Sequence, residues 1–588
     1  MNYFYIFFIS LFTFQSCSYH MARKKTSDLH SHVKYLAADK LEGRYPGSKG
    51  GKMAAEYIKK QFIKNNLTLL GEDGFQYFDI ITGVELGYNN YLLFENNKYV
   101  PNTDYIPLSF GKNINFKGEV SFIGYGFTIE NDSIQWNDYE KHDVSDKWVM
   151  ILRGAPDGNN PHGIYGEHIS LRTKAILAKD NSAKGIIFVS GEIFDNDDEL
   201  IPLTYDSAQK DLGIPIIHMK RDLANKLLKN NNISINKLES KINNDLEKFS
   251  GFNLENDLDV QTDVVFKKKI TQNVIGFIKG NNDSLNNEYI VIGAHYDHLG
   301  YGGDKSGSRR PYLNEIHNGA DDNASGVSIL LQLSKILSLN KGINRNILFI
   351  AFGAEEMGLI GSKYFINSNM IPNEKIQIMI NMDMVGRLNN EKNINISGTK
   401  TATNLEQKLK IIMDNNKINY TFSSEGYGPS DHSSFYVKNI PVLFFFTGAH
   451  TDYHTPLDDY DKLNYQGMKL ITNVIHSLTL DFDKSEKLVF NKTNSKKTSR
   501  PSKFKVTLGI MPDYVFNKIK GLRIDAVIPN KTADKAGLLS GDVIIEINHK
   551  PVSDIYEYMH RLSEINEGET IPIIVIRNNS KIQLNATF

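Results

Sequence analysis

The chain of 588 residues lacks several features that would narrow its class at once. It has one cysteine, so no disulfide can form within it. Lysine and arginine (67) nearly balance aspartate and glutamate (68), and this net charge of −1 gives no reason to expect nucleic acid as a partner. We find no internal repeat. The remaining composition is that of a globular protein, and the length exceeds what one core supports, so three or four domains are expected.

One long apolar run stands at the N-terminus. Residues 1–16 are nearly all apolar or aromatic but too few to span a bilayer, which is typical of a secretory signal peptide. The sole cysteine, Cys17, follows directly, and the pattern resembles a bacterial lipoprotein signal, although Phe14 replaces the usual leucine and no Lys or Arg precedes it. The alternative is a plain signal peptide with an incidental cysteine. We expect an exported protein, periplasmic or on the cell surface, anchored to a membrane by lipid on Cys17 through a tether, residues 17–27.

Apolar periodicity divides the rest of the chain. Residues 28–109 combine helical patterns with a glycine-rich turn, and residues 110–230 hold short β-rich runs around one helix, which indicates an insert. In residues 231–483, apolar strands alternate with amphipathic helices. That alternation predicts an α/β fold with a mostly parallel sheet covered by helices on both faces. Residues 484–503 have the composition of a linker, and residues 504–588 form a last compact unit.

Metal-binding residue types follow the apolar strands of this α/β region. The carboxyl ends of parallel strands meet at one edge of a sheet, so these side chains should lie close together. Two imidazoles and three carboxylates suit zinc better than calcium or magnesium. Taken singly, each has another explanation: a histidine in the core, a helix N-cap, or solvated glutamates. Five at successive strand ends favour metal. They lie in the segments His295–His298, Asp321–Asn323 and Glu355–Glu356, at Asp383, and in the segment Asp452–Thr455.

The segments that carry these residues resemble a known family. HYDH, NGADDNASG, AEEMGLIGS, NMDMVGR, SDHSSF and YHTPLDD, in this order, are similar to the motifs of the zinc aminopeptidases with co-catalytic zinc. Relatives of that family include glutamate carboxypeptidase and the transferrin-receptor ectodomain. The early segment AADKLEGRYPGSKGGKMAAEYI is similar to the family's N-terminal helices. The resemblance implies a zinc exopeptidase-like fold that binds two zinc ions (Zn2+, two per chain).

Carried over residue by residue, the resemblance implies a complete ligand set. His295 and Asp383 would hold one zinc, Glu356 and His454 would hold the other, and Asp321 would bridge the two. A shared carboxylate of this kind holds two ions about 3.5–4 Å apart.

The resemblance also assigns roles beside the metals. Glu355 would be the general base, and Asp297 would orient His295 through its second ring nitrogen. Asp322 would follow the bridging residue across a cis peptide bond. Three further histidines near the motifs are interpreted as polar structural residues: His298, His317 and His432.

The flanking modules resemble known domains as well. The insert, with GYGF, AILAKDNSAKG and IPIIHM, is similar to a protease-associated domain, and an inert insert is the alternative. Residues 504–588, with AGLLSGDVIIEIN, resemble a PDZ domain whose Leu508-Gly509-Ile510 segment would form the carboxylate-binding loop. That resemblance implies capture of a peptide C-terminus. The alternative is a brace that packs on the peptidase and binds nothing.

The leading hypothesis is an extracytoplasmic zinc-dependent aminopeptidase. It would hydrolyse N-terminal residues from peptides with a metal-activated water and Glu355 as the base. One alternative is a zinc enzyme with other chemistry, of the glutaminyl-peptide cyclotransferase or carboxypeptidase type. Another is a non-catalytic receptor or adaptor that uses the insert and the PDZ domain for binding.

Overall fold

The structure is a computed structural model. It describes residues 28–130, 134–158, 160, 163–166, 168–205, 211–244, 249–303, 306–493, 506–512, 519–528 and 530–588. The predicted signal peptide, the tether and Cys17 lie outside these residues. No helix within the described ranges is long and apolar enough to cross a membrane. The chain divides into two compact units: Met1–Ile80 with Lys269–Ser499, and Ile81–Lys268 with Arg500–Phe588.

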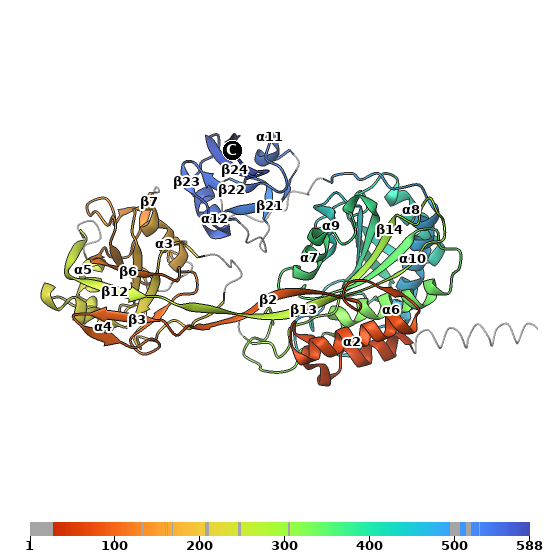
Figure 1. The fold of residues 1–588 in the computed structure, drawn as a ribbon, viewed down its shortest axis with the longest axis horizontal. Coiled ribbons are helices and arrows are strands. Elements are labelled where there is room, and N and C mark those ends of the chain that lie inside the picture. Colours follow the sequence, from red (N-terminus) through yellow and green to blue (C-terminus); the bar gives the residue numbers. More distant parts are fainter. Residues whose placement is uncertain are drawn as a thin grey trace, which may run out of the picture. The chain divides into compact units, whose positions relative to one another are not determined.

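A nine-stranded sheet forms the centre of the first unit (Figure 1). Its strands, in spatial order, are β1 (Thr68–Leu69), β13 (Val264–Ile278), β15 (Asn346–Phe352), β14 (Tyr289–His295), β16 (Ile376–Met382), β19 (Val442–Phe446), β17 (Asn393–Ser397) and β18 (Asn419–Phe422), with β2 (Phe75–Leu86) beside β13. The central strands β15, β14, β16 and β19 are parallel, whereas β13 and β17 join them antiparallel. The predicted α/β class is therefore confirmed, and its parallel part is the centre of the sheet.

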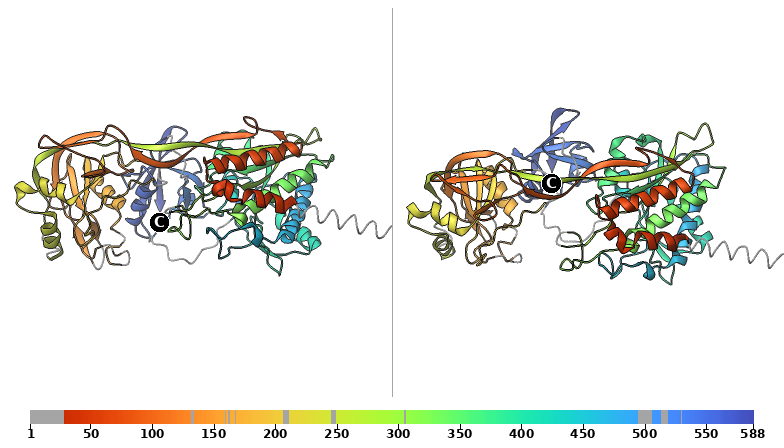
Figure 2. Two further views of the ribbon diagram at one scale, coloured as in Figure 1. Left: turned by 90° about the horizontal axis from the view of Figure 1, so that it is seen from below. Right: turned by 60° about the horizontal axis from the view of Figure 1, so that its bottom comes forward.

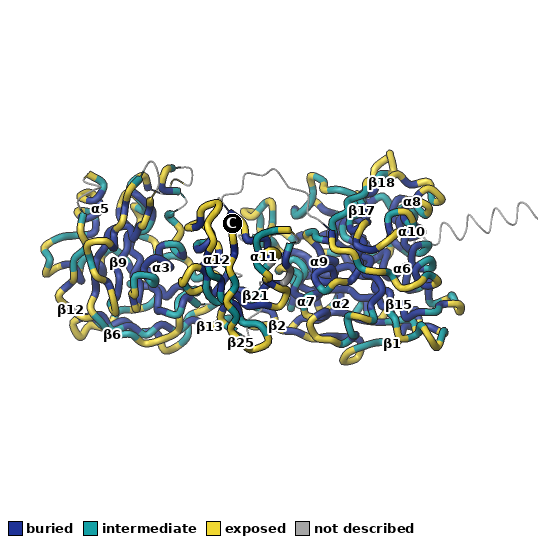
Figure 3. The backbone as a smooth tube through the Cα atoms, turned by 90° about the horizontal axis from the view of Figure 1, so that it is seen from above, coloured by how far each residue is buried: buried dark blue, intermediate teal, exposed yellow. Residues whose placement is uncertain are grey.

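Helices cover both faces of this sheet. Side chains alternate along a strand, so Ile290 and Ile292 of β14 enter one core while Val291 enters the other. The first core includes the helix of residues 28–36 and α2, which lie side by side in both views of Figure 2. In Figure 3 the backbone through the middle of the first unit is mostly coloured as buried, and exposed residues lie mainly at its edges. The first face is covered by α2 (Lys49–Lys64), α6 (Gly326–Ser338), α8 (Leu405–Asn416) and α10 (Tyr465–Lys484), and the second by α7 (Ile360–Ser368) and α9 (His432–Tyr436).

The insert in the second unit is longer than predicted. Its eight-stranded sheet has the order β4 (Asn97–Tyr99), β3 (Tyr91–Phe94), β12 (Phe252–Gln261), β6 (Asn115–Phe122), β9 (Trp148–Leu152), β10 (Gly185–Val189), β11 (Ile216–Met219), β5 (Tyr105–Pro107). The predicted bounds, 110–230, miss four of these strands. The missed strands β3, β4, β5 and β12 are mostly short or partly polar, and pairing rather than local sequence defines them: β5 pairs with β11, β12 with β6, β3 with β12 and β4 with β3.

Smaller elements complete the insert and the first unit. The insert also holds β7 (Thr128–Glu130), β8 (Gln135–Asn137), α3 (Leu171–Asp180), α4 (Arg221–Leu227), η2 (Lys229–Asn231) and α5 (Ile235–Asn244). The first unit adds η1 (Asp39–Arg44), η3 (Ala320–Ser325), η4 (Asn373–Lys375) and η5 (Tyr460–Lys462).

The C-terminal module has its own core. Its sheet is ordered β20 (Ile510–Pro512), β21 (Leu522–Val527), β22 (Val543–Ile547), β24 (Thr570–Arg577), β25 (Ser580–Thr587), with β23 (Lys550–Pro551) on β22, and its helices are α11 (Thr532–Lys535) and α12 (Ile555–Ser563). The predicted linker 484–503 begins too early. Phe490 bridges Ala402, and Thr493 Oγ1 lies 2.9 Å from the hydroxyl of Tyr436, so the chain up to residue 493 packs on the first unit.

Candidate metal centre

The carboxyl ends of the parallel strands carry the predicted residues. His295 is the last residue of β14, Glu355 and Glu356 follow β15, and Asp383 follows β16. His454 lies in the longer loop after β19. Because these strands run in one direction, their ends meet at one edge of the sheet and bring the side chains together.

Two groups of ligand-type atoms form at this edge. In the first, His295 Nε2 lies 3.3 Å from Asp383 Oδ1 and 3.3 Å from Asp322 Oδ1. In the second, His454 Nε2 lies 3.1 Å from Asp322 Oδ2 and 3.3 Å from Glu356 Oε2. Asp322 therefore offers one carboxylate oxygen to each group, and it is the residue that joins them.

The predicted bridging residue, Asp321, is wrong by one position. Asp321 Oδ1 accepts a hydrogen bond of 2.6 Å from the backbone N–H of Gly386, and its Oδ2 lies 3.2 Å from His450 Nε2. Its carboxylate thus has partners away from His295 and His454. The side chains of the neighbouring residues Asp321 and Asp322 point to different sides of η3. Asp458 holds the backbone in this conformation, because its carboxylate accepts the N–H groups of both residues. The cis peptide bond likewise joins Asp322 to Asn323, one residue later than expected.

Asp297 contacts His295 differently from the prediction. Its carboxylate accepts the backbone N–H groups of Glu355 at 3.0 Å and Glu356 at 3.2 Å. The ring atom His295 Nδ1 lies 3.3 Å from the Asp297 carbonyl oxygen and 3.9 Å from its carboxylate. Asp297 therefore orients His295 through its main chain, while its side chain holds the loop that presents the two glutamates. Burial raises the pKa of Asp297 to about 6.

His298 belongs to the cluster, although the sequence analysis interpreted it as structural. It is fully buried, and its Nδ1 lies 2.7 Å from Glu356 Oε1 and 3.8 Å from Asp322 Oδ2. Its only sequence signal was its place three residues after His295. The other two histidines lie elsewhere: His317 Nε2 is 2.8 Å from Ser308 Oγ, and His432 stacks on Phe444.

Arg44 connects two loops that carry cluster residues: the loop after β14 and the loop that leads into η3. This arginine, 1% exposed, donates to the carbonyl oxygens of Tyr296 at 2.7 Å, Asn318 at 2.5 Å and Gly319 at 2.9 Å. Tyr296 stands between His295 and Asp297, and Gly319 begins the turn that leads to Asp322. The glycine-rich early segment thus contributes to the site by fixing backbone.

The cluster concentrates charge where little water reaches. Burial alone would lower the pKa of His454, but hydrogen bonds to Asp322 and Glu356 raise it to about 10. Burial would likewise lower the pKa of His295, yet Asp383 and Glu355 hold it well above its ordinary value. The pKa of Asp322 is held well below its ordinary value against burial by His298 and His295. For Glu355 burial dominates, reinforced by Glu356 and Asp383, and its pKa is raised well above normal.

The donor set fits a divalent metal. His454 Nδ1 lies 2.9 Å from the carbonyl oxygen of Gly307, and His295 Nδ1 faces that of Asp297, so each Nδ1–H has an acceptor. Each Nε2 then directs a lone pair at carboxylate oxygens, which is stable only with a proton or a cation between them. Atoms about 2.0–2.1 Å from a tetrahedral zinc lie about 3.3 Å apart, and the separations of 3.1–3.3 Å match that value. Nitrogen with carboxylate ligands is the mixture zinc prefers.

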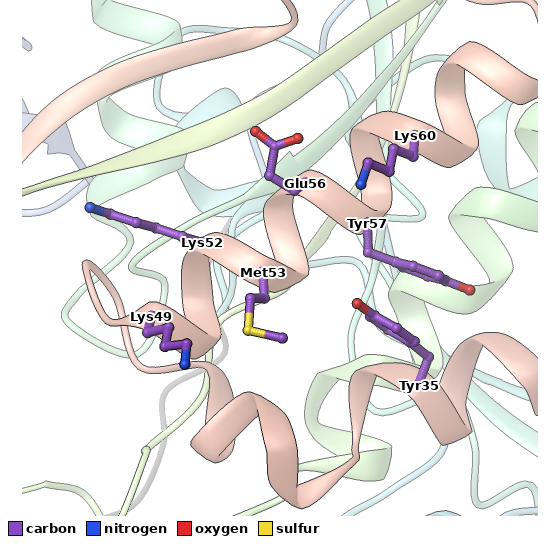
Figure 4. Close-up of a pocket in the computed structure, with 7 residues that line it drawn as sticks. All are labelled: Tyr35, Lys49, Lys52, Met53, Glu56, Tyr57 and Lys60. Atoms are coloured by element: carbon purple, nitrogen blue, oxygen red, sulfur yellow. The ribbon is translucent and has the colours of Figure 1, made fainter.

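A surface hollow elsewhere in the first unit is separate from this cluster (Figure 4). It has a volume of about 560 Å³ between the helix of residues 28–36 and α2. The rings of Tyr35 and Tyr57 stack 3.9 Å apart on its wall. Its lining consists of Tyr35, Lys49, Lys52, Met53, Glu56, Tyr57 and Lys60, none of which belongs to the cluster.

A parallel α/β sheet whose carboxyl edge joins two histidine–carboxylate groups through one aspartate defines the zinc exopeptidase-like class of fold. Residues 273–479 match the model of Peptidase family M28, and residues 493–587 match that of the PDZ domain. The first unit thus contains a region of the peptidase family M28 type, and residues 493–587 form a PDZ domain, as the sequence resemblance predicted.

Similar proteins include named aminopeptidases. Aminopeptidase YwaD of Bacillus subtilis (strain 168) is 25% identical over 334 residues, which cover 53% of this chain and 60% of that protein. Leucine aminopeptidase 2 of Trichophyton rubrum is 29% identical over 203 residues, covering 33% and 37%. The solved aminopeptidase from Aneurinibacillus sp. strain AM-1 is 21% identical, with a TM-score of 0.44 over 79% of this chain and 95% of that one. The chain spans less than two thirds of the length of these two curated relatives.

Proposed function

We propose that this chain is an extracytoplasmic aminopeptidase that uses two zinc ions per chain to hydrolyse N-terminal residues from peptides. The observation that carries the proposal is Asp322, whose two carboxylate oxygens face His295 and His454 at 3.3 and 3.1 Å. His295, Asp322 and Asp383 would hold one ion, and Asp322, Glu356 and His454 the other. Asp321 is not a ligand in this proposal.

Glu355 is the general base of the proposed reaction. Two bound zinc ions would supply the Lewis acidity that lowers the pKa of water and polarises the scissile carbonyl. Glu355 Oε2 lies 3.9 Å from His295 Nε2. Its carboxylate is therefore beside the proposed ligands, but it is not one of the groups that Asp322 joins. Its carboxylate takes the proton of the attacking water and returns it to the leaving amine nitrogen. Asp297 supports this step because it fixes the backbone N–H of Glu355.

The acidic cluster also suits a substrate with a free α-amine. Asp383 and Glu355, 14% and 10% exposed at their side chains, are the cluster carboxylates that surround His295 and still reach solvent. A protonated amine near them forms charge-assisted hydrogen bonds, which an acetylated amine loses. The similar proteins aminopeptidase YwaD and leucine aminopeptidase 2 are named for the same activity, which supports the proposal.

Time-resolved mass spectrometry of a peptide digest, with zinc quantified in the same preparation, tests the proposal. Unblocked peptides should shorten one residue at a time from the N-terminus, their acetylated versions should survive, and about two zinc ions should be found. Shortening from the C-terminus would indicate a carboxypeptidase. One zinc, with an N-terminal glutamine converted to pyroglutamate by loss of ammonia on an otherwise intact peptide, would indicate a cyclotransferase, and no turnover with the metal bound would indicate a binding protein.

Export, lipid anchoring and the roles of the flanking modules are also proposals. The apolar run before Cys17 supports export, and the position of this sole cysteine supports its lipidation. Cells fed a clickable fatty acid should label the wild-type chain and leave Cys17→Ala unlabelled; equal labelling would contradict the assignment. We further propose that the insert is a protease-associated domain and that the PDZ domain binds peptide C-termini.

A further inference from the structure

Helix α12 of the PDZ domain carries a stripe of charged residues that its own domain does not need for a core. Asp554 caps the helix, and Glu557 and Arg561 follow at spacings of three and four residues, so all three lie along one side. They are buried nonetheless: Asp554 is 2%, Glu557 0% and Arg561 1% exposed. Buried charges require partners, because an unpaired one costs several kcal/mol in desolvation.

The partners are on helix α3 of the insert, within the same compact unit. Arg172 Nη1 lies 2.7 Å from Asp554 Oδ2, and Lys179 Nζ lies 2.6 Å from Glu557 Oε1. Arg561 Nη2 donates to Asp180 Oδ1 at 2.8 Å. Each of these three charges of the α12 segment thus meets an opposite charge on α3, in a stripe along the length of that helix.

An aromatic contact strengthens one end of this stripe. The guanidinium of Arg172 lies 4.8 Å from the ring centroid of Phe110 in the insert and 4.4 Å from that of Tyr556 in the PDZ domain. A guanidinium between two rings gains cation–π attraction on both sides and is desolvated there, which makes its ion pair stronger. The contact therefore combines charge matching with shape.

We propose that α12 is a docking element whose partner is α3 of the same chain, so that the PDZ domain and the insert form one body held by an electrostatic latch. Ile555 and Met559, four residues apart, lie on another side of α12, and Met559 is 39% exposed. The latch uses the Asp554–Arg561 side and leaves that second side outside the contact. The sequence left a brace on the peptidase as the alternative to peptide binding; in this proposal the PDZ domain packs on the insert instead, and the contact does not preclude a ligand on the PDZ domain.

Hydrogen–deuterium exchange of the full chain tests the latch by changing one helix and observing the other. Lys179→Glu, on the insert, should raise exchange of the α12 backbone about tenfold at low salt. The matched change Glu557→Lys in the same chain restores opposite charges and should return most of that protection. Lys550→Glu, which breaks an exposed pair with Glu564 inside the PDZ domain, is the control and should leave α3 unchanged.

Three results would overturn the proposal. Unchanged α12 exchange in Lys179→Glu would show that the charges do not hold the helix. If the variant Lys179→Glu with Glu557→Lys does not regain protection, and Asp180→Arg with Arg561→Asp does not keep it, charge pairing is not the cause of the protection of α12. Protection that disappears on dilution would assign α3 of a second copy as the partner. Faster hydrogen exchange in β9 and β10 would reveal that Lys179→Glu has unfolded the insert. In that case the variant that carries both Asp180→Arg and Arg561→Asp decides.

Discussion

At the scale of single residues, individual side chains determine where the proposed zinc ions would bind. The two adjacent aspartates of η3 have separate surroundings: Asp322 faces the two histidines, whereas Asp321 faces Gly386 and His450. We predict that Asp322→Asn loses both zinc ions, since it removes charge from both groups. Asp321→Asn, the matched control, should keep most of its zinc. Metal analysis after dialysis checks this, and the opposite ranking of the two variants would return the bridging role to Asp321.

Glu355 should affect turnover and not metal content. Its carboxylate lies beside the ligand groups, and Glu355→Gln keeps its size while removing the base. Loss of a general base costs about a hundred- to ten-thousand-fold in kcat. We expect that loss with zinc content and thermal stability near those of the wild type. If kcat stays within a fewfold of normal, another group takes the proton.

At the scale of elements, the sequence predicted the positions of the strands better than the conformations of the loops that follow them. The largely apolar strands β14, β15 and β16 could be located because both of their faces are buried, and their carboxyl ends placed His295, Glu356 and Asp383. A choice between adjacent residues depends on backbone turns and on remote acceptors such as Asp458, which leave no local signal. His298 was missed for the same reason, and the edge strands of the insert because pairing defines them.

One strand of the insert carries a histidine that should make its stability depend on pH. His218 of β11 is fully buried, with Nδ1 accepting the N–H of Ile201 and Nε2 3.3 Å from Ser190 Oγ. Burial, with Arg153 nearby, lowers its pKa to about 3. The folded state therefore stays neutral while the unfolded chain gains a proton below about pH 6.5, so stability is lost as pH falls from there toward 3.

The expected loss between pH 7 and pH 5 is about 2 kcal/mol from this residue. Hydrogen exchange of β10 and β11 at the two pH values, corrected for intrinsic rates, measures it. His218→Gln should flatten the dependence, with protection at pH 5 closer to that at pH 7. An unchanged slope in this variant would assign the acid sensitivity to other groups.

For the whole molecule, two units with separate cores should unfold separately. The proposed zinc ligands all belong to the first unit, whereas the insert and the PDZ domain share the second. Calorimetry should therefore show at least two transitions, and a chelator should lower only the one that belongs to the first unit. A ligand at a hundred times its Kd stabilises by about 2.7 kcal/mol, which sets the scale of the shift. One transition that moves as a whole would show that the units unfold together.

The two strands that connect the units have a consequence for biosynthesis. β2 and β13 pair with each other, and the boundary between the units falls inside both strands. As the chain leaves the ribosome, the helices before Ile80 are made first, but all strands of the sheet they cover other than β1 and β2 are made only from Val264 onward. The complete insert is synthesised in between, with a hydrophobic core of its own. Domains fold as units during synthesis, so the insert can fold before β14 has been synthesised. The helices that are synthesised first are then among the last to pack against their sheet.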